Sequence, residues 1–229
     1  MTVAVPLHRD QFTDASRTAL HFGQLRVEIW RAPTGVEMLR IRTLKGHVTI
    51  LPFMGQMLWD ATFEGLNLGM SSQFDMPRPA PTIIGTYGCL GFHSGLLANG
   101  VPGPDDTHPV HGEFPTCRMD QATLFAGEDH RGRYVELWGR RNHVEGFGPH
   151  YDAEPTVRVY ETDTMIDWGM RVTNRSAFPM PLQYMAHLNP AFLPGATIHQ
   201  PAPFTPERTQ VRRDVTADVV ASPEYLALI

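Results

Sequence analysis

Apolar and polar residues alternate with a period of two over several short segments of this chain. In the first third, these segments are residues 27–31, 37–42, 47–51 and 57–63, with turn residues at 33–35 and 45–46. Such alternation is typical of strands that bury one face, and short breaks join such strands into a meander. We therefore predict four consecutive antiparallel strands in this region.

The same pattern returns in the second half of the chain. Strands are predicted over residues 133–140, 156–162, 165–174 and 181–188, and the apolar run 225–229 predicts the start of another. Helical periodicity is scarce, so the chain is expected to be all-β, an antiparallel β-sandwich with little helix. Its 229 residues suit one domain spanning residues 1–229.

Residues 76–118 interrupt this pattern. They hold seven prolines and seven glycines, which leave little room for regular structure. Loops of this length in a compact domain usually carry function or are disordered, and the aromatic residues here, such as Tyr87, Phe92 and Phe114, argue against disorder. We predict a loop-rich segment that covers a binding pocket.

Charge and composition exclude several classes of partner. The net charge of −5 gives no basic footprint for nucleic acid, and the cluster Arg208, Arg212 and Arg213 is interpreted as a solvated strand face. No apolar run approaches the roughly 20 residues that span a bilayer, and no signal peptide is apparent. With Cys89 and Cys117 as the two cysteines, we expect free thiols and a cytoplasmic protein that binds neither membrane nor nucleic acid.

Two histidine motifs carry the candidate chemistry. One is His108-Pro-Val-His111-Gly-Glu113, and the other is residues 183–189, which contain His187. The unperturbed pKa of histidine lies close to neutrality, so the side chain can donate or accept a proton at cellular pH. Imidazoles held together on a β scaffold indicate proton transfer or metal binding, and an enzyme is the first hypothesis.

The order of the motifs resembles the galactose mutarotase-like superfamily. Residues 157–174, the prolines at 179 and 181, and His187-Leu-Asn189 resemble its central block, while residues 97–100 and 108–112 resemble its loop with a His-Gly pair. Residues 58–69, 91–95 and 187–192 are most similar to the aldose-1-epimerase-like branch. The resemblance covers residues 24 to 215. It implies a supersandwich enzyme that interconverts sugar anomers by opening and closing the ring, with no cofactor and no metal.

The resemblance also implies roles for individual residues. His187 matches the general acid at the sugar ring oxygen, and His111 matches the histidine that hydrogen-bonds the sugar. The family's glutamate base lies on a strand beyond the histidine strand, so the chain looks truncated at its C-terminus relative to the family. Glu113 is then the best candidate base, although the branch usually has arginine at that position. The expected substrate-binding residues are His93, His108, Asn99 and Asn189.

Two other functions use the same residues. A non-catalytic carbohydrate-binding sandwich would explain the missing base. A cupin-like, metal-dependent sugar isomerase would use His108, His111, Glu113 and His187 as ligands, although the His-x-x-His-x-Glu spacing differs from the usual cupin pattern. In each case a small-molecule sugar is the expected partner.

Two further expectations concern surfaces. An incomplete sandwich would expose strand edges, which favours a homo-oligomer. Trp59, Trp138 and Trp168 could stack on a sugar, although aromatic residues on alternating strands are more often part of the core.

Overall fold

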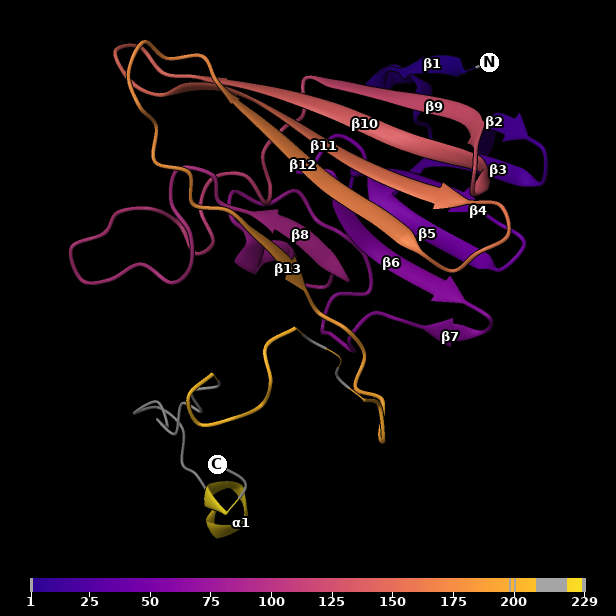
Figure 1. Ribbon diagram of the computed structural model, residues 1–229. Coiled ribbons are helices and arrows are strands. Elements are labelled where there is room, and N and C mark those ends of the chain that lie inside the picture. Colours follow the sequence, from indigo (N-terminus) through magenta and orange to yellow (C-terminus); the bar gives the residue numbers. More distant parts are fainter. Residues whose placement is uncertain (1, 198, 200, 209–221, 228–229) are drawn as a thin grey trace. The chain divides into compact units, whose positions relative to one another are not determined.

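The computed structural model describes residues 2–197, 199, 201–208 and 222–227 (Figure 1). The chain divides into two compact units, Met1–Phe192 and Leu193–Ile229. Among the described residues, all the strands lie in the first unit, and the second contains one helical turn, α1 (Pro223–Leu226). The single domain predicted over residues 1–229 stays a prediction.

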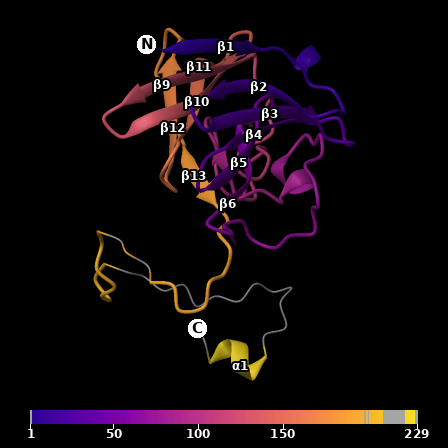
Figure 2. The same cartoon turned by 90° about the vertical axis from the view of Figure 1, so that its right-hand side faces the viewer.

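The first unit contains two antiparallel sheets (Figures 1 and 2). The five-stranded sheet has the order β1 (Val3–Leu7), β9 (Gln121–Asp129), β10 (Gly132–Val144), β11 (His150–Tyr160) and β12 (Ile166–Asn174). The eight-stranded sheet runs β13 (Met185–Leu188), β8 (Gly91–Ser94), β6 (Met57–Phe63), β5 (Gly46–Leu51), β4 (Glu37–Arg42), β3 (Leu25–Arg31) and β2 (Arg17–Phe22), and β7 (Leu66–Asn67) pairs with β6. Two short 3-10 turns, η1 (Arg9–Gln11) and η2 (Ile83–Thr86), lie between strands.

The predicted all-β, antiparallel class is confirmed. The four-strand meander corresponds to β3–β6, and the later segments lie in β10, β11, β12 and β13. Five strands were not predicted: β1, β2, β7, β8 and β9. No helix in the described part of the chain is long and apolar enough to cross a membrane.

Two predictions need correction. The apolar run at residues 225–229 was expected to begin a strand, but Tyr225 and Leu226 belong to α1, and residues 228 and 229 lie outside the described residues. The predicted loop over residues 76–118 contains β8 and η2, because Gly91–Ser94 finds a pairing partner in β13, far along the chain. Of the basic cluster, Arg212 and Arg213 lie outside the described residues.

Alternation of apolar residues builds the main core between the two sheets. Val27 and Ile29 of the eight-stranded sheet belong to one buried cluster with Leu124, Leu137 and Val157 of the five-stranded sheet. Fully burying such a side chain contributes about 1.5–3 kcal/mol.

A second apolar cluster supports the opposite face of the eight-stranded sheet. It includes Met57, Trp59 and Phe92 and no residue of the five-stranded sheet. The pairing of β5 with β6 shifts between Thr49 and Ile50, so that Trp59 is an extra, unpaired residue. Met57 and Trp59 therefore lie on the outer face beside Phe92, whereas Ala61 and Phe63 beyond the bulge belong to the main core.

Candidate functional site

His111 and His187 meet on the outer face of the eight-stranded sheet. His187 lies on β13 and His111 in the loop after β8, and their ring centroids are 4.9 Å apart at an interplanar angle of 70°. Phe92, directly opposite His187 in the β8–β13 register, stacks on its ring at 4.6 Å and 13°. The structure thus brings together two imidazoles from segments 76 residues apart in the chain.

Backbone geometry explains why glycine follows His111. His111 and Gly112 have φ angles of +64° and +79°, in the left-handed region. A Cβ atom at position 112 would lie 2.1 Å from the carbonyl oxygen of Ala98, so only glycine fits. Hydrogen bonds from His111 N to Gly100 O (2.8 Å) and from Gly95 N to His111 O (2.9 Å) fix this residue in place.

Tyr87 completes the arrangement around His187. Its hydroxyl is hydrogen-bonded to His187 Nε2 at 3.2 Å, and the two rings lie edge to face. Burial raises the pKa of Tyr87, so its hydroxyl stays protonated at neutral pH. Nothing in the sequence marked this residue, because it lies in the glycine-rich segment 100 positions before its partner.

Electrostatics favour neutral imidazoles. Burial lowers the pKa of His187, and burial together with the nearby His187 lowers the pKa of His111. Each ring buries a Nδ1 atom that has no hydrogen-bond partner in the described structure. Because a pKa below 6.5 leaves the imidazole uncharged at pH 7, each ring has one nitrogen that can accept a proton and one that can donate.

Glu113 points to the loop backbone. Its Oε1 accepts hydrogen bonds from Leu96 N (2.9 Å), Leu97 N (3.0 Å) and the Tyr151 hydroxyl (2.9 Å). The carboxylate thereby ties the loop after β8 to β11. The predicted role of Glu113 as a base stays a prediction beside these loop contacts.

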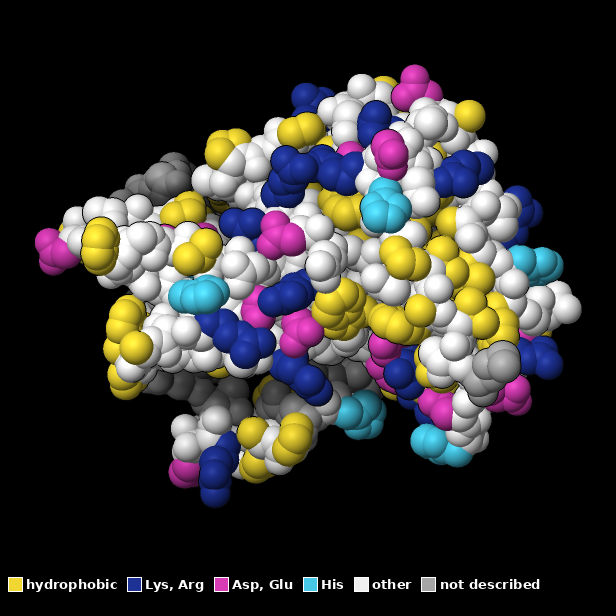
Figure 3. Space-filling model, turned by 90° about the horizontal axis from the view of Figure 1, so that it is seen from above, with side chains coloured by type: hydrophobic (Ala, Val, Ile, Leu, Met, Phe, Trp, Pro, Cys, Tyr) yellow, Lys and Arg dark blue, Asp and Glu magenta, His cyan; other side chains and the backbone are white. Residues whose placement is uncertain are grey.

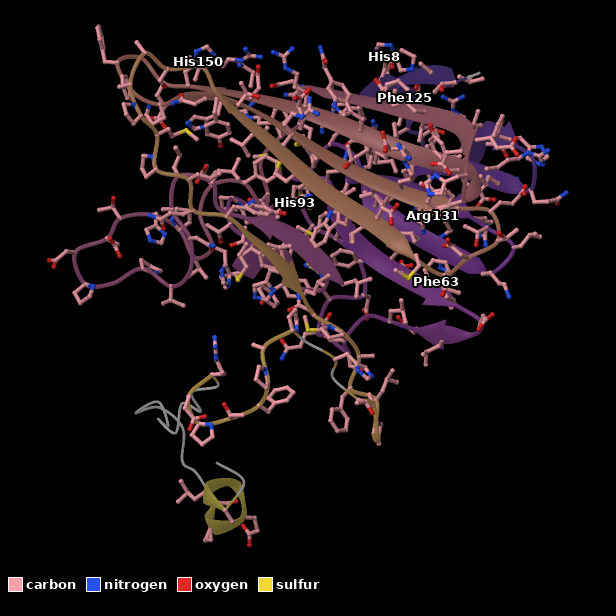
Figure 4. The ribbon with its side chains drawn as sticks, viewed as in Figure 1. His8, Phe63, His93, Phe125, Arg131 and His150 are labelled. Atoms are coloured by element: carbon pink, nitrogen blue, oxygen red, sulfur yellow. The ribbon has the colours of Figure 1, made fainter. Side chains whose placement is uncertain are left out.

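His93 (Figure 4) follows Phe92 in β8, and the alternation of the strand turns it away from the outer cluster, towards Phe114 of the main core. Its ring is buried against Trp168, with centroids 4.5 Å apart, and its Nδ1 is hydrogen-bonded to the Tyr184 hydroxyl at 2.9 Å. Burial lowers its pKa to about 3. The alternation of the strand thus separates this predicted sugar-binding residue from the His111–His187 pair.

The other predicted sugar-binding residues hold their own loops. His108 Nδ1 donates to Pro109 O at 2.9 Å. Asn99 Oδ1 accepts hydrogen bonds from the Ser94 hydroxyl and from Gly100 N. Asn189 Nδ2 donates to Cys89 O at 3.1 Å. Their predicted contacts with a sugar stay predictions.

Possible metal ligands and surface hollows complete the description of the site. Among the described residues, no three histidine, cysteine, aspartate or glutamate side chains are grouped so that they could hold a metal ion. Three hollows in the surface are lined by other residues, and the His111–His187 pair lies on an open, half-buried face.

Comparisons with known proteins agree with this fold. No protein-family profile matches the sequence, and no curated protein matches it. The structure is similar to the crystal structure of a "putative aldose 1-epimerase" from Klebsiella pneumoniae subsp. pneumoniae, with a TM-score of 0.65 and 11% sequence identity over 82% of this chain. The match covers 55% of that protein's chain. The fold is therefore galactose mutarotase-like.

Proposed function

We propose that this protein interconverts the anomers of an aldose. The observation that carries the proposal is the pair His111 and His187, 4.9 Å apart beside Tyr87, on a galactose mutarotase-like fold. Anomer exchange needs two proton transfers at neighbouring oxygens of one sugar. One imidazole in its neutral form and one in its protonated form, held on one face, supply an acceptor and a donor for them.

In the proposed reaction, His111 acts as the general base and His187 as the general acid. His111 in its neutral form accepts the proton of the anomeric hydroxyl while His187 in its protonated form gives a proton to the ring oxygen, and the bond between C1 and that oxygen breaks. The open-chain aldehyde then turns its other face to the hydroxyl. On ring closure His187 takes its proton back from the C5 hydroxyl and His111 gives its proton back to the anomeric oxygen, so the cycle consumes nothing. Each well-placed group is worth about 10²- to 10⁴-fold in rate.

Tyr87 is a positioning residue in this scheme. Its hydrogen bond to Nε2 fixes the orientation of the His187 ring, and Phe92 stacks against the same ring from β8. Side chains held by packing and by outer hydrogen bonds keep the geometry that proton transfer requires. The sugar class is an aldose that can open its ring.

Exchange NMR on a panel of freshly dissolved aldoses tests the proposal. We expect accelerated exchange with at least one sugar, lost in His187→Gln and His111→Gln and kept in His130→Gln, a change in an exposed turn. The rate should rise as the pH falls from 8 towards the lowered pKa of His187, whose protonated form is the donor, and should fall once His111 is protonated as well. Acceleration that survives both substitutions in the pair would contradict the proposal.

A second candidate is a carbohydrate-binding sandwich without catalysis. It is favoured by Glu113, the candidate base, whose carboxylate is occupied by the loop backbone and by Tyr151. Sugar binding without accelerated exchange in the same NMR experiment would support this candidate.

A further inference from the structure

The outer face of the five-stranded sheet, which points away from the core, carries the indole of Trp138. Leu137 and Val157 point into the core, so their neighbours Trp138 and Thr156 face outward. The strand register aligns Trp138 of β10, Thr156 of β11 and Gly169 of β12 in one row across the sheet. Figure 3 shows this side of the molecule, where acidic and basic side chains alternate around hydrophobic ones.

Gly169 leaves this row incomplete. A Cβ atom there would meet only the Thr156 hydroxyl, at 3.0 Å, with no other atom within 4 Å. The missing side chain opens a hollow of about 480 Å³ beside the half-buried indole. Glu136, Glu154 and Arg171 also line it. Ligand pockets of small molecules have volumes of about 300–1,000 Å³.

Most polar groups around the hollow have no protein partner in the described structure. Glu154 and Arg171 face each other in the β11–β12 register, yet among the described residues neither makes an ion pair. Among the described residues, the Thr156 hydroxyl and the Trp138 indole nitrogen likewise have no protein hydrogen-bond partner. Glu136, in contrast, is paired with Arg158 at 2.8 Å. The Glu154 carboxylate, the Arg171 guanidinium and the Thr156 hydroxyl therefore lie around the indole of Trp138.

We infer that this hollow is a second carbohydrate site, which binds a neutral pyranose ring by stacking on Trp138. A pyranose presents C–H groups on its faces, which pack on an indole, and hydroxyls at its rim, which bind a carboxylate and a guanidinium side by side. The site lies on the opposite side of the sandwich from His111 and His187, because Trp138 and Phe92 point away from the common core. It does not depend on the proposed catalysis.

The charges argue for a neutral sugar over an anionic one. Glu136 and Glu154 balance the guanidinium groups of Arg158 and Arg171 around the hollow, so no excess positive charge attracts a phosphate or a carboxylate. A purely apolar ligand would leave the unpaired Glu154 and Arg171 without partners.

The test uses methyl α- and β-glycosides of glucose and galactose, which cannot open their rings. Titration of ¹⁵N-labelled protein is followed at the indole N–H signals, with that of Trp138 identified by its loss in Trp138→Phe. We expect this signal to shift in a saturable way with at least one glycoside. Trp138→Ala, followed at the backbone amide signals of Thr156 and Gly169, and Gly169→Val should each weaken binding about tenfold or more, the second by filling the hollow.

Control variants separate this site from the other. Phe125→Ala removes an outer aromatic residue of β9 (Figure 4) that does not line the hollow, and it should leave the affinity unchanged. His187→Gln should leave the Trp138 shift intact, so a failure of catalysis does not affect this test. Absence of a saturable Trp138 shift with all the glycosides, or equal binding by folded Gly169→Val, would overturn the inference. A methyl glucuronide that binds more tightly than every neutral glycoside would also overturn it.

Discussion

At the scale of single residues, the chemistry of the site depends on which nitrogen atoms and hydroxyl groups the fold leaves in contact. His187 and His111 were both found from sequence motifs, because a histidine in a conspicuous local pattern is visible in one dimension. Tyr87 and Tyr184 were not, because their hydrogen bonds to His187 and His93 join segments that only the fold brings together. The sequence thus identified the candidate proton-transfer groups but not the residues that orient them.

Removing the Tyr87 hydroxyl tests its positioning role. Tyr87→Phe keeps the ring against His187 but deletes the hydrogen bond to Nε2. With a hydrogen bond worth about 1 kcal/mol, we expect anomer exchange to slow about fivefold through kcat, with little change in KM. The pH dependence of kcat should also shift, which a merely structural role would not produce. Tyr134→Phe on the other sheet is the control, and a Tyr87→Phe rate equal to wild type would exclude the role.

Buried His93 should make stability depend on pH. Burial lowers its folded-state pKa to about 3, whereas the unfolded chain has a value near 6.5, so the unfolded state binds the proton first as the pH falls. Stability should be fully present above pH 6.5 and decrease towards pH 3, by about 2 kcal/mol between pH 7 and pH 5.

Urea unfolding of His93→Gln at a series of pH values measures this contribution. The variant lacks the titrating ring, so its free energy of unfolding should change less between pH 7 and pH 5 than that of wild type. His21→Gln, on the exposed side of β2, is the matched control. A variant with the same pH slope as wild type would show that His93 is not the group responsible.

At the scale of elements, the loop between β8 and β9 positions His111. Sequence analysis predicted a functional loop there but not its internal structure, because glycine and proline counts report backbone freedom and not the contacts that remove it. These contacts join segments that are distant in the sequence. The Glu113 carboxylate accepts a hydrogen bond from Tyr151 on β11, and β8 pairs with β13. Non-local pairing of a four-residue strand leaves little periodic signal.

The His-Gly pair offers a matched test of this loop. Gly112 and Gly100 have nearly equal φ angles, +79° and +78°. A Cβ atom added at Gly112 would clash with Ala98 O, whereas one added at Gly100 would meet no atom within 4 Å. Alanine at either position adds the cost of a left-handed residue, about 1–2 kcal/mol, and Gly112→Ala adds a clash with Ala98 O. By thermal unfolding and exchange NMR, Gly112→Ala should be the less stable and the less active. Equal effects of the two substitutions would mean that the close approach does not constrain His111.

Glu113 can be tested as a loop anchor and as a base in one comparison. Oε1 receives its hydrogen bonds from Leu96, Leu97 and Tyr151, so the amide oxygen of Glu113→Gln can keep them. As an anchor, Glu113→Gln should exchange anomers within about threefold of wild type, whereas Glu113→Ala should lose roughly 2–4 kcal/mol of stability. A loss of about 10²-fold or more in Glu113→Gln, with unchanged stability, would restore the role of base.

At the scale of the whole molecule, alternation was sufficient to predict the class of fold. Strands with strict alternation and clear turns, such as β3–β6, were located, whereas β9, although nine residues long, was not. The arrangement into two sheets is set by the long-range pairing of β1 with β9 and of β13 with β8. Local patterns carry no information on such partners.

Strand β13 also matters at this scale, because it carries His187 at the edge of the eight-stranded sheet. In the part of the chain that the structure describes, its far side pairs with no other strand. An open edge is a site for pairing with another chain. The homo-oligomer expected from the sequence stays a prediction, which light scattering of the purified protein can measure.

The central claim is that His111 and His187 act as one proton-transfer unit on a sugar. Its most direct test is the rate of anomer exchange, measured by NMR, for wild type, His111→Gln, His187→Gln and the double variant. We expect wild-type protein to accelerate anomer exchange. Each single variant should lose this acceleration, and the double variant should lose scarcely more, because the effects of groups that act as a unit are not additive. No acceleration by folded wild-type protein with any aldose, or independent and additive losses in the two variants, would contradict it.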